Sequence, residues 1–193
     1  TPISHSLKTC QRGRGSTTER RNEVDRRVDA RFGEPVGGRD SRRAGAAAPR
    51  HNRPTLTFKA SPIRVRVPAS SANLGSAFDC GGLALSLYDE LIAQITDDEG
   101  IQVDIHGEGA DDLPRNHRHL VAKSMLAAFD AMGGRPRGFA LVCANHIPHG
   151  RGLGSSSAAI VGGIVLARAL VVGGDQLLPD ADAIALASEL EGH

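Results

Sequence analysis

Apolar residues recur at helical spacing in the second half of the chain. Between His119 and Met132 one stripe holds, at three- and four-residue intervals, Val121, Met125, Ala128, Phe129 and Met132. Gly133 and Gly134 follow this stripe and are typical of residues that end a helix. A run of small and apolar residues from Ser155 to Val172, and an amphipathic pattern from Pro179 to Glu191, predict two further helices.

Alternating and continuous apolar segments predict a sheet. Val103 and Ile105 alternate with Asp104 and His106, which is the pattern of a strand with one face in water. Strands are predicted at 63–67, 82–88, 91–96, 101–106 and 139–144, with a turn over 73–79. Strands and helices in this order predict an α+β domain of two layers, and its length suffices for an independent core.

The first 58 residues differ in composition from the rest. They contain 13 Lys or Arg and 6 Asp or Glu, whereas residues 59–193 contain 10 and 16. Large apolar residues are few in residues 1–58 and follow neither the 3.6-residue period of a helix nor the two-residue period of a strand. We therefore predict a disordered Arg-rich segment before a folded domain at 59–193. Three roles are considered for this Arg-rich segment: a targeting peptide, a nucleic-acid-binding arm, or translated upstream sequence without a selected role. The repeated Arg, Gly and Ala favour the third. No membrane span is expected, because glycines and Arg168 interrupt the longest apolar run, Ile160 to Val172.

A glycine-rich segment joins the last predicted strand to the helix that begins at Ser155. It reads Pro148-His149-Gly150-Arg151-Gly152-Leu153-Gly154-Ser155-Ser156-Ser157. Glycines adopt positive φ and let the backbone approach an anion, and the N-terminus of a helix presents free N–H groups. Serines at a helix start are suited to cap it, and their hydroxyls can bind phosphate or Mg²⁺. The spacing is that of neither a Walker A loop nor a dinucleotide fingerprint, and it predicts a phosphate-binding site for a nucleotide.

This segment resembles the phosphate loop Pro-x-x-x-Gly-Leu-Gly-Ser-Ser-x-Ala of the GHMP kinases, with every fixed position filled from Pro148 to Ala158. The resemblance implies the amino-terminal domain of that superfamily, a two-layer fold like ribosomal protein S5 domain 2, with the carboxy-terminal domain absent. It also implies ATP as the phosphate donor. The ATP contacts that it carries over are Pro148, Gly150, Arg151, Gly152, Leu153, Gly154, Ser155, Ser156 and Ser157.

A second segment is similar to the homoserine kinases within that superfamily. It contains Pro68-Ala69-Ser70-Ser71-Ala72-Asn73-Leu74-Gly75 and, after Phe78 and Asp79, continues from Gly82 to Asp89. The resemblance implies that Asn73 and Asp79 contact the amino-acid substrate, whose ammonium group a carboxylate can pair. The family has Gly-Pro-Gly before Phe-Asp whereas this chain has Gly75-Ser76-Ala77, so we expect strain at Ala77 if the turn requires positive φ there.

The last residues, Glu189-Leu190-Glu191-Gly192-His193, carry a third likeness. In homoserine kinases a helix of this kind provides an acidic Mg²⁺ ligand. The resemblance implies Ser156 and Glu189 as the Mg²⁺ ligands, with Glu191 as the alternative to Glu189, and it implies that His193 borders homoserine. Without the family, two glutamates near a helix end are typical of solvated surface charge.

The resemblance covers about residues 60–193, the first half of such a kinase. It implies ATP-dependent phosphorylation of the side-chain hydroxyl of L-homoserine to O-phospho-L-homoserine, a cytoplasmic step of threonine biosynthesis, and we expect the chain alone to be inactive. Catalysis would depend on positioning and electrostatics, with no residue assigned as general base. A homodimer of the full-length protein is left open. The alternatives are another GHMP kinase such as mevalonate kinase, and a non-catalytic S5-like nucleic-acid binder with a basic arm, which the phosphate loop disfavours.

Overall fold

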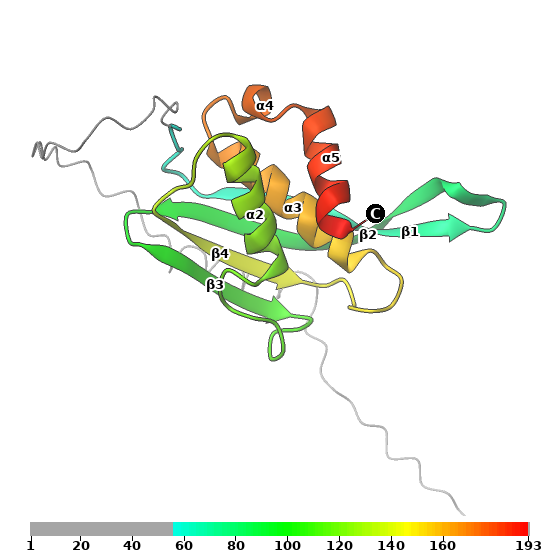
Figure 1. The fold of residues 1–193 in the computed structure, drawn as a ribbon. Coiled ribbons are helices and arrows are strands. Elements are labelled where there is room, and N and C mark those ends of the chain that lie inside the picture. The colour runs from blue at the N-terminus through cyan, green and yellow to red at the C-terminus, as the bar shows by residue number, and fades with distance from the viewer. Residues whose placement is uncertain (1–55, 193) are drawn as a thin grey trace, which may run out of the picture. The chain divides into compact units, whose positions relative to one another are not determined.

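The structure, a computed structural model of the chain, describes residues 56–192. Its four-stranded sheet has the order β1-β2-β4-β3, formed by β1 (Ile63–Leu74), β2 (Ala77–Thr96), β4 (Gly138–Asn145) and β3 (Gly100–Gly107). Strands β3 and β4 are parallel, and the other neighbours are antiparallel. One side of the sheet carries the helices α2 (Leu120–Ala131), α3 (Ser155–Leu170), α4 (Gly174–Leu177) and α5 (Asp180–Glu191) (Figure 1). The predicted α+β domain of two layers is confirmed.

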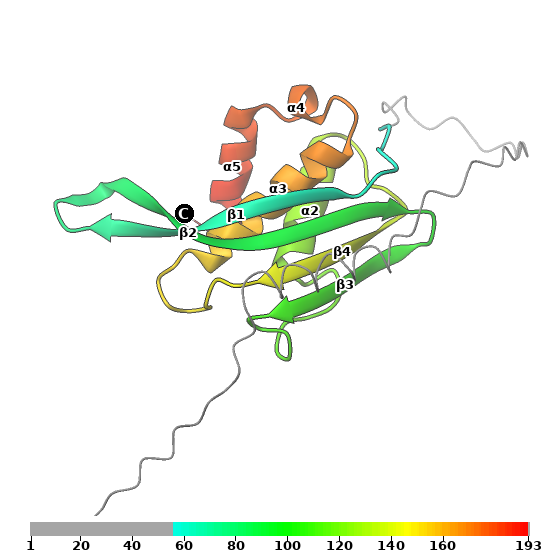
Figure 2. The ribbon, with the colours of Figure 1, turned by 180° about the vertical axis from the view of Figure 1, so that it is seen from behind.

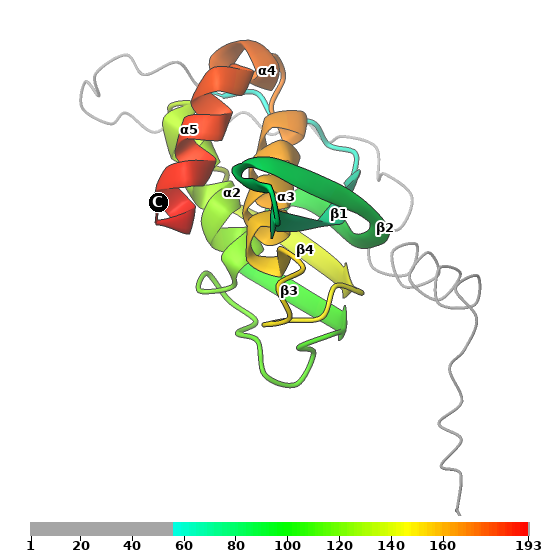
Figure 3. The same ribbon diagram turned by 90° about the vertical axis from the view of Figure 1, so that its right-hand side faces the viewer.

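Helix α3 is the centre of the helical layer and packs against α2, α5 and the first two strands (Figure 3). Two glycines permit this close packing. A Cβ on Gly162 would lie 2.4 Å from Leu91 Cδ1, and a Cβ on Gly163 would lie 2.6 Å from the carbonyl oxygen of Val121. The largest fully buried side chains of the core include Phe129, Phe139, Leu91, Met125, Leu141, Ile160 and Ile164. The apolar run that begins at Ser155 is therefore a core helix.

Strands β1 and β2 continue past the sheet as a two-stranded hairpin (Figures 1 and 2). Strand β2 pairs with β4 only from Glu90 to Thr96, whereas β1 accompanies it as far as the pair Leu74↔Ala77. The turn predicted over 73–79 is therefore shorter, and the strands predicted at 82–88 and 91–96 form one strand. Asp89 and Glu90, the polar residues between those two predictions, pair with Val67 and Arg66 of β1.

Residues 56–58 pack on the domain, although their composition placed them in the Arg-rich segment. The rings of Phe58 and Phe129 meet edge to face with their centroids 5.7 Å apart. The backbone N–H of Val172 donates to the carbonyl oxygen of Thr57 over 2.9 Å. Phe58 also forms a β-bridge with Val171, whose backbone is extended, so α3 ends at Leu170, two residues before the predicted end. The disorder predicted for residues 1–55 falls outside the described residues.

The other predicted helices are confirmed, with ends that differ by one residue at most. The helix predicted from His119 is α2, and the helix predicted from Pro179 is α5. Helix α4 was not predicted, because four residues are too few to show a helical period. Among residues 56–192, none of the helices has the length and apolar composition needed to cross a membrane.

Candidate phosphate-binding site

The glycine-rich segment connects β4 to α3, as predicted. Gly150, Gly152 and Gly154 have φ angles of 64°, 69° and 65°, a region that residues with a Cβ rarely adopt. A Cβ on Gly154 would also lie 2.2 Å from Ser70 Oγ, so the Ser70 hydroxyl would have to move to admit a side chain there. Gly154 is the N-cap of α3, and no side-chain hydrogen bond caps this helix end in the described part of the chain. The capping role expected for the serines is therefore wrong: Ser155 begins the first turn, and the first N–H groups of α3 remain available to an anion.

The loop begins on a buried carboxylate that sequence reasoning missed. Asp89 of β2 is 6% exposed, and its Oδ1 accepts hydrogen bonds from the backbone N–H groups of His146 (2.6 Å) and Ile147 (2.9 Å). Burial raises the pKa of Asp89 above its ordinary value of 3.8, against the opposing effect of these two N–H donors. The signal available in the sequence was a pair of acidic residues, Asp89 and Glu90, between two apolar strand patterns.

The other end of the loop is held by β1. The backbone N–H of Ser70 donates to the carbonyl oxygen of Leu153 over 3.0 Å, and the side chain of Leu153 packs against the core. Ser70 belongs to the segment that resembles the homoserine kinase motif, so the structure brings that segment into contact with the phosphate loop. The side chain of Arg151, in the middle of the loop, is exposed.

A pocket of about 190 Å³ lies beside the start of α3. Its polar lining consists of Asp89, His119, Asn145, His149, Ser155 and Ser156, and the rest of its lining is apolar. His119 is 3% exposed, and its Nδ1 has no hydrogen-bond partner among the described residues. Burial, assisted by the nearby charge of His149, lowers the pKa of His119 to about 4, so its imidazole is neutral at physiological pH. We define this space as the loop-side pocket.

The end of α5 reaches the first turn of α3. The hydroxyl groups of Ser156 and Ser157 each donate to a carboxylate oxygen of Glu191, both over 3.3 Å. Glu189, in contrast, is exposed. The two glutamates diverge because residues two apart on a helix point in nearly opposite directions. Within the described residues there is no group of three or more His, Cys, Asp or Glu side chains that could hold a metal ion.

The substrate residues implied by the resemblance lie on the projecting hairpin. Asn73 is exposed near the hairpin turn with a φ of 59°, in the left-handed region that Asn tolerates better than most residues. Asp79 is the third residue of β2, and His193 lies outside the described residues. The strain expected at Ala77 is absent: among residues 56–192 the positive φ of a non-glycine residue occurs at Asn73, and Ala77 begins a strand.

Comparisons with known proteins agree with these features. The family of GHMP kinase N-terminal domains matches residues 119–193. A homoserine kinase of Streptomyces avermitilis is 58% identical over 136 residues, which are 70% of this chain and 44% of that protein. The crystal structure of a homoserine kinase from Cytophaga hutchinsonii is 28% identical with a TM-score of 0.55, and the match covers 71% of this chain and 44% of that one. A crystal structure of a mevalonate kinase, 17% identical with a TM-score of 0.52 over 67% of this chain and 46% of its own, shares the fold. The chain thus spans less than half the length of the relatives that it matches.

Proposed function

Because this chain belongs to the GHMP kinases, we propose that its full-length protein transfers the γ-phosphoryl group of ATP to the side-chain hydroxyl of L-homoserine. The observation that carries the proposal is the uncapped start of α3 behind three glycines of positive φ. Free N–H groups at a helix start attract phosphate oxygens. The names of the relatives support homoserine as the acceptor. The product would be O-phospho-L-homoserine, formed in the cytoplasm on the way to threonine.

In this proposal the ATP phosphates lie along residues 150–157. The backbone of Gly150, Gly152 and Gly154 leaves room for phosphate oxygens, and the N–H groups of the first α3 turn donate to them. The exposed guanidinium of Arg151 adds a positive charge at the open side of the loop.

We place the nucleoside part of ATP in the loop-side pocket. The mostly apolar lining suits a base or ribose, whereas the carboxylate of Asp89 would repel a further phosphate. The neutral imidazole of His119 has an unpaired Nδ1 that can bind one polar group of the nucleoside. These groups select the orientation of the nucleotide rather than take part in the chemistry.

We further propose that Mg²⁺ binds between α3 and α5. Oxygen atoms are the ligands that Mg²⁺ prefers, and it keeps several waters and substrate phosphates beside one or two protein groups. Ser156 Oγ and the Glu191 carboxylate fit this requirement because they lie 3.3 Å apart at the loop. The family resemblance assigns the acidic ligand to Glu189, and the contacts support Glu191. When bound, the ion would neutralise charge on the transferring phosphoryl group.

Homoserine would bind against the hairpin through Asn73 and Asp79, with His193 beside it. The carboxylate of Asp79 can pair with the substrate ammonium, and the amide of Asn73 can both donate and accept. In the reaction the homoserine hydroxyl oxygen bonds to the γ-phosphorus, the bond to the ADP oxygen breaks, and the hydroxyl proton passes to phosphate or water. The chain's own contribution is to hold acceptor and donor in line.

The test is a coupled ADP-release assay on the purified full-length protein. We expect ADP release that depends on homoserine and not on mevalonate. ADP release that depends on mevalonate would show that the phosphate acceptor is mevalonate and not homoserine. No ATP binding at all, together with salt-sensitive RNA binding that requires residues 1–58, would support the non-catalytic alternative instead.

A further inference from the structure

The connection between β3 and α2, residues 108–119, forms one wall of the loop-side pocket. It contains neither strand nor helix, and its Leu113 and His119 line the pocket. Gly109 lies so close to the phosphate loop that a Cβ would be 2.7 Å from His149 Cε1 and 2.8 Å from Leu113 Cδ1. A small displacement of this connection would therefore change both the pocket wall and its contact with the phosphate loop.

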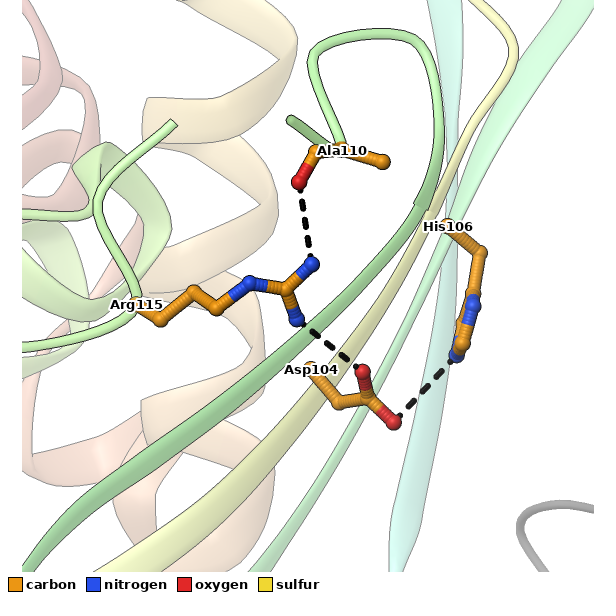
Figure 4. Close-up of polar contacts among 4 residues, drawn as sticks. All are labelled: Asp104, His106, Ala110 and Arg115. Atoms are coloured by element: carbon orange, nitrogen blue, oxygen red, sulfur yellow. Dashed lines mark hydrogen bonds and ion pairs between the residues drawn. The ribbon is translucent and has the colours of Figure 1, made fainter. Parts of the chain in front are cut away.

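Arg115 ties the middle of this connection to the sheet, as Figure 4 shows. Its Nη2 donates to the carbonyl oxygen of Ala110 over 2.9 Å, and its Nη1 donates to Asp104 Oδ1 on β3 over 3.2 Å. The second carboxylate oxygen of Asp104 lies 3.3 Å from His106 Nε2. A planar guanidinium bonded to two separate acceptors holds both at a defined distance, so Arg115 fixes the connection relative to β3.

The two ends of the connection have anchors of their own. At the first end, the backbone N–H of Glu108 donates to the carbonyl oxygen of Asn145 (3.0 Å), and Asn145 Nδ2 donates back to the carbonyl oxygen of Glu108 (3.1 Å). At the other end, the N–H of His119 donates to the carbonyl oxygen of Asn116 over 2.9 Å. Arg115 supplies the link between these ends, beside the pocket-lining Leu113.

We propose that Arg115 is a positioning residue for the nucleotide. Through Ala110 and Asp104 it holds Leu113 at the pocket, and in this way it sets nucleotide affinity without touching the nucleotide. The inference depends on the proposed function, because it takes the loop-side pocket as the nucleoside site. An exposed ion pair contributes little to global stability, so the effect of Arg115 lies in affinity and local order rather than in unfolding.

The test compares Arg115→Ala with a matched control, Arg137→Ala. Arg137 forms an exposed ion pair with Glu99 over 3.1 Å near the opposite end of β3, and it does not line the pocket. In calorimetric titrations of the full-length protein with ATP, we expect Arg115→Ala to weaken binding by about threefold to tenfold. Arg137→Ala is expected to leave the affinity unchanged. Amide hydrogen exchange over residues 108–118 should become faster in Arg115→Ala alone.

A conservative variant separates positioning from general damage. Arg115→Lys keeps the charge but cannot bond both acceptors in the same geometry, so we expect an affinity between those of Arg115→Ala and the unsubstituted chain. Equal affinities for Arg115→Ala and Arg137→Ala, or unchanged exchange over residues 108–118, would overturn the role of Arg115 while leaving the kinase proposal intact. Failure of the unsubstituted full-length protein to bind ATP would overturn the proposed function, and the nucleotide role of Arg115 with it.

Discussion

Single atoms of the first two strands determine the shape of the phosphate loop. Ser70 Oγ occupies the space that a Cβ on Gly154 would need. Asp89 Oδ1 accepts two backbone hydrogen bonds where the loop leaves β4. Both contacts join segments far apart in the sequence, so the loop depends on the β1–β2 hairpin for its conformation.

Replacing Gly154 by Val should abolish nucleotide binding. The new side chain would clash with Ser70 and would also have to adopt a φ of 65°, which is strongly disfavoured for a β-branched residue. Gly152→Ala is the milder comparison, because a Cβ there meets no protein atom within 4 Å and its φ of 69° is unfavourable by about 1–2 kcal/mol. Calorimetric titration with ATP measures both variants. Normal affinity in Gly154→Val would contradict the assignment of the cradle.

Replacing Asp89 should have opposite effects in two variants. Burial raises the pKa of Asp89 in the folded protein above 3.8, its value in the unfolded chain. Between pH 3.8 and the raised pKa, the folded protein therefore binds more protons than the unfolded chain does. Its stability falls as pH rises through this interval. Asp89→Asn keeps an acceptor without a charge, so we expect it to be at least as stable as the unsubstituted chain at pH 7, with no advantage below pH 3.8.

Asp89→Ala should instead be less stable at pH 7 by about 1–3 kcal/mol, because the N–H groups of His146 and Ile147 lose their acceptor. Thermal unfolding of both variants across this pH range measures the effect. Equal destabilisation by Asn and Ala at pH 7 would show that the carboxylate charge itself is required.

Helix α5 presents one face to α3 and the other to solvent. Its buried or half-buried residues are Ala183, Leu186, Ala187, Leu190 and Glu191, at the three- and four-residue spacing of a helix face. Glu191 therefore continues an apolar stripe, which explains why it lies against the serines of α3 whereas Glu189 does not. The face on which an acidic residue lies decides which one can approach the phosphate loop.

The pair Glu189→Gln and Glu191→Gln tests which acidic residue serves the metal. On the contacts to Ser156 and Ser157, we expect Glu191→Gln in the full-length protein to raise the Mg²⁺ concentration needed for half-maximal activity about tenfold or more. Glu189→Gln should then resemble the unsubstituted protein. The reverse result would assign the ligand to Glu189, as the family resemblance implies.

Residues 56–58 belong to the folded domain, so a substitution within them should lower its stability, whereas deletion of the residues before them should not. Deleting residues 1–55 is expected to leave thermal stability nearly unchanged, because their composition offers no apolar face to dock. Phe58→Ala removes the ring contact with Phe129 and, since Phe58 is half-buried, should lower stability by about 1–2 kcal/mol. Denaturant unfolding compares the two. A large loss on deleting residues 1–55 would contradict the prediction of a disordered segment.

The match to this chain covers less than half the length of its relatives, for example 44% of the Streptomyces avermitilis protein. Phosphoryl transfer requires acceptor, metal and γ-phosphate to be positioned together. We therefore expect residues 1–193 by themselves to bind ATP weakly without homoserine-dependent turnover. The ADP-release assay on the short chain, beside the full-length protein, measures this. Comparable turnover by both would show that the described domain contains a complete site.

The sequence by itself determined most of the elements and the place of the glycine-rich loop. The periods of the apolar residues were sufficient for α2, α5 and β3, and the order of glycines was sufficient for the positive φ angles of the loop before α3, because these are local properties of backbone and side chain. Sequence could not distinguish one long strand β2 from two shorter strands. Asp89 and Glu90 interrupt the local pattern, and only pairing with β1 makes them part of a strand.

What only the tertiary structure decided are contacts between distant segments. The bonds of Asp89 to the loop backbone, of Ser156 to Glu191 rather than Glu189, and of Arg115 to Asp104 join residues that are 11 to 58 positions apart. A polar residue has the same local signature whether it faces solvent or a buried N–H group. The difference arises when the helices pack on the sheet and determine which side chains are enclosed, because burial makes each unpaired polar group costly and so requires a particular partner.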